Sequence, residues 1–206
     1  MIELFVSAFI TLFVVIDPPG CAPIFAGLTS NAAPRAARAM AIRATFISAA
    51  ILLVFAIFGE ALLAALHIQL DSFRIAGGIM LFLIALEMVF EKRSQRREER
   101  AEKLIADEVE DVSVFPMAMP MLAGPGSIAT IMLLMSRAQG TEATLVILGA
   151  LAAVLIVTLV ALVAAGPLMR LLGDKVEAVI TRLLGVLLAA LAAQYVIDGL
   201  RGTILA

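Results

Sequence analysis

The chain has 206 residues, of which 63% are hydrophobic, and its formal net charge is −2. Soluble domains are about 45–50% apolar, so a soluble fold of this length could not hide that much apolar surface from water. The near-neutral charge gives no basis for binding nucleic acid. Composition therefore predicts an all-α membrane protein that sits in a lipid bilayer.

Six apolar segments are long enough to cross a bilayer, since about 20 helical residues span a hydrocarbon core of roughly 30 Å. They are residues 2–28, 41–66, 73–90, 114–135, 143–169 and 183–205. A highly charged stretch, residues 91–111, separates the third segment from the fourth. We interpret that stretch as a solvated loop and assign no chemistry to it.

The basic residues orient the six spans, because cytoplasmic loops carry the excess of Lys and Arg. With the charged loop in the cytoplasm, an even number of spans places both termini outside. Twelve of the fifteen basic residues then lie on the inner side, and only Arg74, Arg137 and Arg201 lie outside. All three inner loops share this bias.

The two halves of the chain resemble each other at a nearly constant offset. Aligning Pro19 with Pro125 also aligns Gly20 with Gly126, and the third and sixth spans both open with Arg-x-x-Gly, at Arg74 and Arg182. Residues 1–90 and 113–206 each hold three spans, and the cytoplasmic loop 91–112 joins them. Three spans reverse the direction of the chain, so we expect two inverted three-helix repeats, an arrangement typical of transporters.

Helix-breaking residues lie inside the first and fourth spans, at matching places in the two halves. They are Pro18, Pro19, Gly20 and Pro23 in the first, and Pro116, Pro120, Gly124, Pro125 and Gly126 in the fourth. A proline inside a helix costs about 3 kcal/mol, so neither span can be one unbroken helix. In lipid the freed backbone groups must face protein or water, which favours a binding site near the midplane. The alternative is a pair of proline kinks that only shape the packing.

Each break is expected to start a half-helix. Asp is a favoured N-cap and Pro a favoured first helical residue, so Asp17 should cap a half-helix over residues 18–28. The pair Gly124-Pro125 should start a second one that runs to residue 135. Helix amino termini carry partial positive charge and free N–H groups, so two of them meeting near the midplane would bind an anionic group such as a carboxylate.

A candidate substrate site follows from these half-helices. We expect a substrate carboxylate on the N–H groups near Gly20, Gly126 and Ser127, and a substrate ammonium on the Thr130 hydroxyl or on Asp17. Asp17 is a structural cap, a carrier of the coupled proton, or an ionised group that attracts a cation or the ammonium, and the sequence leaves these roles open. The substrate-binding candidates are Asp17, Pro18, Pro19, Gly20, Gly124, Pro125, Gly126, Ser127 and Thr130.

Three further charged residues are candidates for coupling or gating. Glu87 lies close to the charged loop and is expected near the interface. Arg74 and Arg182 start helices at opposite interfaces, where each serves as a snorkelling anchor or as a gating contact. One His and one Cys cannot make a zinc site, and no cofactor motif or nucleophile–base pair is present, so we expect neither a metal, nor a cofactor, nor an enzyme.

Three motifs together resemble the MarC-related family of bacterial inner-membrane proteins. They are Asp17-Pro18-Pro19-Gly20 with Pro23 and Phe25, Phe73-Arg74-Ile75-Ala76-Gly77-Gly78, and Ala123-Gly124-Pro125-Gly126-Ser127 with Thr130. The resemblance covers nearly the whole chain and implies six spans in a bacterial inner membrane. For some members it also implies transport of small neutral amino acids such as glycine and alanine. The chain departs from the pattern at Cys21, where a polar residue such as Asn is expected.

The resulting interpretation is a secondary transporter of small neutral amino acids, driven by a proton or sodium gradient. The alternatives are a non-transporting membrane scaffold or accessory subunit, and an exporter of other small molecules. The two breaks in register favour a transporter over a scaffold, which has no need for either break.

The distribution of basic residues generates a test of topology. Reporter tags fused to either terminus should be detected from outside the cytoplasm, and a tag inserted beside Arg96 from inside, because the inner loops carry the positive charge. Protease protection in intact cells and in inverted vesicles measures this. A carboxyl terminus found in the cytoplasm would contradict both the topology and the inverted repeat.

Overall fold

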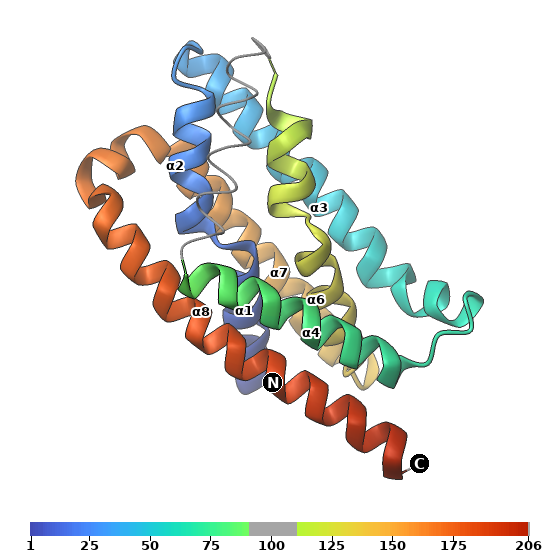
Figure 1. The fold of residues 1–206 in the computed structure, drawn as a ribbon. Coiled ribbons are helices and arrows are strands. Elements are labelled where there is room, and N and C mark those ends of the chain that lie inside the picture. The colour runs from blue at the N-terminus through green and yellow to red at the C-terminus, as the bar shows by residue number, and fades with distance from the viewer. Residues whose placement is uncertain (91–110, 206) are drawn as a thin grey trace.

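A computed structural model describes residues 1–90 and 111–205, apart from the side chains of 167–178 and 205. The described residues form helices joined by short turns, with no strand among them (Figure 1). The elements are α1 (Ile2–Ile16), α2 (Pro18–Leu28), α3 (Pro34–Ala65), α4 (Leu70–Val89), the irregular helical segment η1 (Ser113–Leu122), α6 (Pro125–Met135), α7 (Gly140–Val163) and α8 (Ala165–Leu205).

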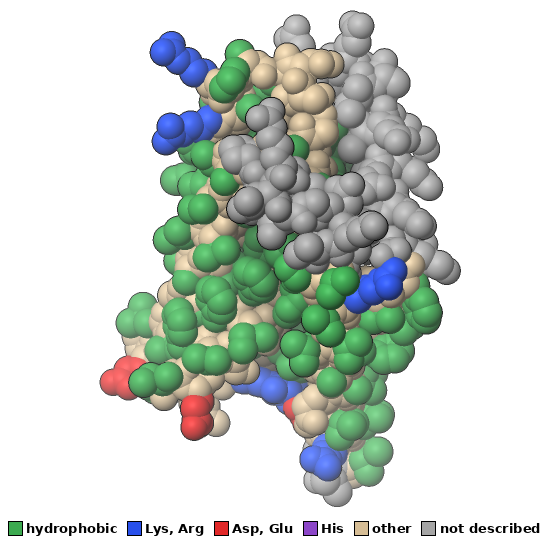
Figure 2. All heavy atoms as spheres, turned by 90° about the vertical axis from the view of Figure 1, so that its left-hand side faces the viewer, with side chains coloured by type: hydrophobic (Ala, Val, Ile, Leu, Met, Phe, Trp, Pro, Cys, Tyr) green, Lys and Arg blue, Asp and Glu red, His purple; other side chains and the backbone are tan. Residues whose placement is uncertain are grey.

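Five stretches of the described chain are long and apolar enough to cross a membrane. They are Ile2–Leu28, Pro34–Ala65, Leu70–Val89, Gly140–Val163 and Val179–Ile204. Ser113–Leu122 and Pro125–Met135 form a pair of helices bent by 51° at their break, and the number of spans is six if this pair crosses the membrane as one broken span. Hydrophobic side chains cover the middle of the face shown in Figure 2, and charged side chains stand mainly towards its two ends. The prediction of an all-α membrane protein is confirmed, and the six predicted spans correspond to five long apolar helices and one bent pair.

The first span breaks at Asp17. Its backbone lies in the left-handed region, with φ 60° and ψ 64°, so α1 ends at Ile16 and α2 begins at Pro18. A residue before proline is excluded from ordinary helical geometry, and Asp is one of the few side chains that tolerate a positive φ. Because Pro18 and Pro19 have no amide hydrogen, the carbonyls four residues earlier cannot receive their helical hydrogen bonds.

The second break has the same cause but a longer irregular stretch. Phe115 and Met119 have extended backbone inside η1, and each precedes a proline, which disfavours helical geometry at that position. The chain then turns at Gly124, where a Cβ would lie 2.2 Å from the carbonyl oxygen of Pro120, so only glycine fits. Both half-helices start and end where the sequence predicts, α2 at residues 18–28 and α6 at residues 125–135.

Helices α4 and α8 run antiparallel, side by side along one side of the bundle (Figure 1). Their backbones approach closely at glycines: a Cβ on Gly78 would lie 2.9 Å from the Ala192 carbonyl oxygen, and one on Gly185 would lie 3.1 Å from that of Ala85. Lipid tails are as apolar as leucine, so membrane helices associate through such close packing of small residues.

Two helices extend beyond the apolar segments that predict them. Helix α3 starts at Pro34 rather than at residue 41, and α8 starts at Ala165 rather than at residue 183. The fifth span correspondingly ends at Val163, six residues early. Charged residues such as Arg, Lys and Glu are good helix formers, so a helix continues into the aqueous phase where the apolar pattern stops.

Several contacts between elements have a counterpart when the two halves of the chain are exchanged. Helix α1 packs against α7 as η1 packs against α3, and α2 packs against both α7 and α8 as α6 packs against both α3 and α4. The contacts of α1 with α8, of α7 with α8 and of α6 with α7 have no such counterpart among the larger contacts. The superposition of residues 1–90 on 113–206 remains a prediction.

The close approach of α4 and α8 generates a stability prediction. Gly185→Leu should lower the melting temperature of the purified protein, because the new side chain meets the Ala85 backbone and Met88, and overpacking costs about 1–3 kcal/mol. Gly149→Leu is the matched control, since no described atom lies within 4 Å of a Cβ at that site in α7. Circular dichroism in detergent measures both variants, and equal melting temperatures would contradict the packing described.

Candidate functional site

The start of α6 lies inside the protein and is uncapped. No described side chain caps it from Gly124, and the first α-helical bond within it is donated by the amide of Ile128 to the Gly124 carbonyl, 3.0 Å away. The amides of Gly126 and Ser127 belong to the first turn and have no acceptor within the helix. Both residues are buried, Ser127 to 3% exposure. The protein interior therefore holds a helix end that favours an anion.

The start of α2, in contrast, already carries its own anion. The Gly20 amide donates to Oδ1 of Asp17 at 3.1 Å, and the Asp17 side chain is buried, with 1% exposure. A Cβ on Gly20 would lie 2.3 Å from Oδ2 of Asp17, so the carboxylate sits directly on the first turn. The Gly20 amide, predicted to hold a substrate carboxylate, is occupied by Asp17 in this structure, which leaves the start of α6 for a ligand anion.

The two breaks lie beside one another. A Cβ on Gly126 would lie 3.6 Å from Cγ1 of Val15, which is two residues before Asp17. Consecutive Cα atoms are 3.8 Å apart, so the Cα atoms of Val15 and Asp17 are at most about 8 Å apart. The other wall beside Gly126 is Ile84 of α4, 2.5 Å from the same Cβ position. The first turn of α6 and the Asp17 carboxylate thus belong to adjoining segments.

Thr130 is the buried polar residue that stands out in α6. Its side chain is fully buried, and among the described residues its hydroxyl has no hydrogen-bond partner. Threonine hydroxyls elsewhere in the described helices donate to the carbonyl four residues earlier, as at Thr11, Thr29, Thr45, Thr144, Thr158 and Thr203. Thr130 lies one turn after Gly126, on the same face of α6. An unpaired buried hydroxyl costs about 1–3 kcal/mol, so its presence here calls for a ligand or a functional role.

The remaining residues of the predicted site form the helix starts at the two breaks and contribute no polar side chain. Pro18 and Pro19 are the first two residues of α2, with Pro18 buried and Pro19 half-buried. Gly124 is buried as the N-cap of α6, and Pro125, its first helical residue, is exposed. These prolines fix the helix starts and supply no hydrogen-bond donor.

The gating candidates lie on α4 and α8. Arg74 is half-buried and pairs with Asp71 of its own helix at 2.8 Å. Arg182 is exposed on α8. Glu87 is half-buried and lies one turn after Ile84, the α4 residue that packs against Gly126 at the second break. Gly185, three residues after Arg182, packs against Ala85 and Met88, so Arg182 and Glu87 lie in the same part of the α4–α8 contact. Arg74 is 13 residues from Glu87 on α4, or about 20 Å away.

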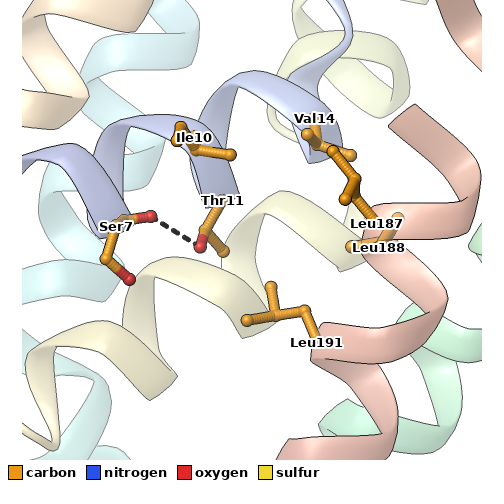
Figure 3. A pocket seen from close by; sticks show the side chains of 7 residues that line it. All are labelled: Ser7, Ile10, Thr11, Val14, Leu187, Leu188 and Leu191. Carbon is orange, nitrogen blue, oxygen red and sulfur yellow. Dashed lines mark hydrogen bonds between the residues drawn. The ribbon is translucent and has the colours of Figure 1, made fainter. Parts of the chain in front are cut away.

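One cavity of about 370 Å³ opens between α1 and α8 near the first break (Figure 3). Its walls are aliphatic apart from Ser7 and Thr11, and the Thr11 hydroxyl donates a hydrogen bond to the Ser7 carbonyl oxygen at 2.7 Å. Two of its lining residues, Ile10 and Leu187, are exposed at the surface of the bundle. A cavity lined in this way suits hydrocarbon rather than a polar solute.

Two ion pairs join residues far apart in the chain and could not be predicted from the sequence. Arg137, just after α6, pairs with Asp198 of α8, lies 4.6 Å from the centre of the Tyr195 ring, and shares Asp198 with Gln194. The partners are 61 residues apart in the chain, so no spacing rule connects them. This cluster ties the carboxyl end of α6 to α8.

The second ion pair joins the amino-terminal part of α3 to the residue two positions before η1. Arg43 pairs with Asp111, and the Ser113 amide donates to Asp111 at 2.9 Å. The hydroxyl and amide of Ser113, with the Arg43 guanidinium nearby, hold the pKa of the Asp111 carboxyl below its ordinary value. The pair fastens the start of the second half to α3.

Comparisons with known proteins agree with this architecture. A family model described as MarC family integral membrane protein matches residues 2–204. The chain is 36% identical to the UPF0056 membrane protein MJ1677 of Methanocaldococcus jannaschii over 205 residues, 99% of either chain. It is also 36% identical to the UPF0056 inner membrane protein YhgN of Escherichia coli K12, over 95% of either chain. No solved structure matches. With five apolar helices long enough to cross a membrane, one bent helix pair and a match over almost its full length, the chain belongs to the MarC family of integral membrane proteins.

Proposed function

We propose that the protein is a secondary transporter of small neutral amino acids such as glycine and alanine, bound between the two helix breaks. The observation that carries the proposal is the pairing of an uncapped α6 start with the adjacent Asp17 carboxylate. A free amino acid at neutral pH carries one carboxylate and one ammonium. The amides of Gly126 and Ser127 suit the carboxylate, and Asp17 together with the Thr130 hydroxyl suits the ammonium.

The walls of the site favour a small, uncharged side chain. Gly126 contributes no side chain, and Val15 and Ile84 close in on it from two helices. Asp17, Ser127 and Thr130 are each at most 3% exposed, so the substrate site is shut off from both aqueous phases. A charged substrate side chain in these surroundings would have to be buried without a partner, at a cost of several kcal/mol.

A transporter explains features that a scaffold or accessory subunit would not need. A buried helix start without a cap and a buried hydroxyl without a partner both reduce stability. A protein with only a packing role gains nothing from either. A ligand that occupies the site satisfies both groups, and its release leaves them ready for the next molecule.

The energy source and the orientation complete the proposal. Asp17 couples uptake to a gradient, either by carrying a proton or by attracting a cation. YhgN is named an inner membrane protein, and we propose the same membrane for this chain, with both termini outside the cytoplasm and the loop 91–112 inside. The excess of basic residues on the inner side supports this orientation.

Thr130→Val separates binding from folding. The variant keeps the shape of the side chain and removes a hydroxyl that has no partner, so the melting temperature should stay the same or rise. Counterflow of labelled glycine or alanine in proteoliposomes should nevertheless fall about tenfold, the effect of losing roughly 1.4 kcal/mol of binding. Thr158→Val is the control, because its buried hydroxyl bonds to Val154 at 2.8 Å, and it should lose stability but retain counterflow. Full counterflow by Thr130→Val would remove Thr130 from the site.

Asp17 variants separate the charge from the cap. Asp17→Asn keeps an oxygen that can accept from the Gly20 amide, so it should fold, yet it should lose gradient-driven uptake because the charge is gone. Asp17→Ala loses the cap as well. Its free energy of unfolding should fall by about 1 kcal/mol, and its melting temperature should fall with it. If Asp17→Asn transports like the parent and only Asp17→Ala is impaired, Asp17 is a cap and nothing more.

A further inference from the structure

Two other cavities lie at opposite ends of the bundle. The α2 cavity, about 480 Å³, is lined by the carboxyl end of α2, the start of α3 and the end of α7, and includes Ser30 and Arg38. The α6 cavity, about 290 Å³, is lined by the carboxyl end of α6, the later part of α3 and the start of α7, and includes Glu60 and Ser136. Arg38 and Glu60 are 22 residues apart on one helix, which separates them by about 33 Å at 1.5 Å per residue.

The two cavities occupy equivalent places in the two halves of the chain. Five of the nine residues that line the α6 cavity stand 106 positions after a residue that lines the α2 cavity, including Met132 after Ala26 and Ser136 after Ser30. This is the offset that aligns Pro19 with Pro125 at the breaks. The shape of the surface and the repeat in the sequence thus select the same residues independently.

The breaks lie between the two cavities. Each cavity adjoins the carboxyl end of a half-helix whose amino end is at a break, and each half-helix has 11 residues, or about 16 Å. Helix α2 leads from Asp17 towards the α2 cavity, and α6 leads from Gly124 towards the α6 cavity. The residues that line the two cavities include none of the buried residues at the breaks. The path from either end is therefore closed before it reaches the site.

We infer that the two cavities are the inner and outer vestibules of one solute path, which passes between α2 and α6 at the breaks. The inference rests on the proposed function. The α2 cavity opens to the cytoplasm and the α6 cavity to the outside, as the distribution of basic residues orients the chain. Movement of α6 connects the site to the outer vestibule, and movement of α2 connects it to the inner one. Polar groups line both cavities, Thr29, Ser30 and Arg38 in one and Glu60, Ser136 and Thr144 in the other, so both suit water and a polar solute rather than lipid.

Single cysteines test the two vestibules without any substrate. The native Cys21 is fully buried and stays in place, with the parent protein as the baseline. Ala26→Cys and Met132→Cys place equivalent thiols in the α2 and α6 cavities. Val54→Cys and Phe58→Cys are lipid-facing controls on α3, at apolar positions that are 53% and 60% exposed at the bundle surface. Each variant is treated with a membrane-impermeant cationic methanethiosulfonate, in intact cells and in inside-out vesicles.

Met132→Cys should react in intact cells and Ala26→Cys in inside-out vesicles, each at least about tenfold faster than its control, because only a hydrated thiol ionises to the reactive thiolate. Thr29→Cys and Met135→Cys, which line the same cavities, repeat the test should either first variant fail to fold. Labelling of both cavities from one side, or rates equal to the lipid-facing controls, would overturn the assignment. Labelling as expected without any glycine or alanine counterflow would retain the two vestibules and reject the proposed substrate.

Discussion

Hydrocarbon offers no hydrogen bonds, and this constraint governs both breaks in the protein. Pro18 and Pro19 remove two amide donors from the middle of the first span. In the fourth span three donors are missing, at Pro116, Pro120 and Pro125. The groups that lose their helical partners cannot face lipid, so both breaks are turned inwards. The protein interior consequently holds helix ends and polar side chains, while aliphatic and aromatic side chains cover the lipid-facing surface.

The two breaks resolve the same constraint differently, and the site follows from the difference. Asp17 caps α2 with its own carboxylate, which fixes a negative charge beside Gly20. No described side chain caps α6, so its start keeps the donors and the partial positive charge. Two inverted repeats with identical breaks would present two like ends to a ligand. One capped and one uncapped end present opposite charges instead, and a zwitterion matches that arrangement.

Much of this architecture could be predicted from the sequence, because proline and glycine act locally. The N-cap at Asp17, the helix starts at Pro18 and Pro125, and the bend before α6 all follow from residues within a few positions. The early start of α8 could not be predicted from hydropathy, because charged residues continue a helix as readily as apolar ones. The predicted cap at Asp17 uses the Gly20 amide, so this amide does not serve both as a cap donor and as the predicted contact of a substrate carboxylate in this structure.

Features that depend on tertiary contacts were beyond the sequence. The sequence makes Thr130 a candidate through its place one turn after Gly126, but it does not show that this buried hydroxyl lacks the intrahelical partner that Thr158 has. The Arg137–Asp198 pair joins residues 61 positions apart. The α2 and α6 cavities depend on how side chains from three or more segments fill the space between helices, which no local pattern gives.

The central claim is that the start of α6 and the Asp17 carboxylate together bind the two charges of one amino acid. The most direct measurement is the melting temperature of the purified protein with glycine or alanine, compared with glycinamide and ethylamine, which keep the ammonium but lack the carboxylate. A ligand that binds only the folded state at 100 times its Kd adds about 2.7 kcal/mol of stability. The account predicts a rise with the two amino acids alone. An equal rise with all four compounds, or no rise with any of them, would contradict it.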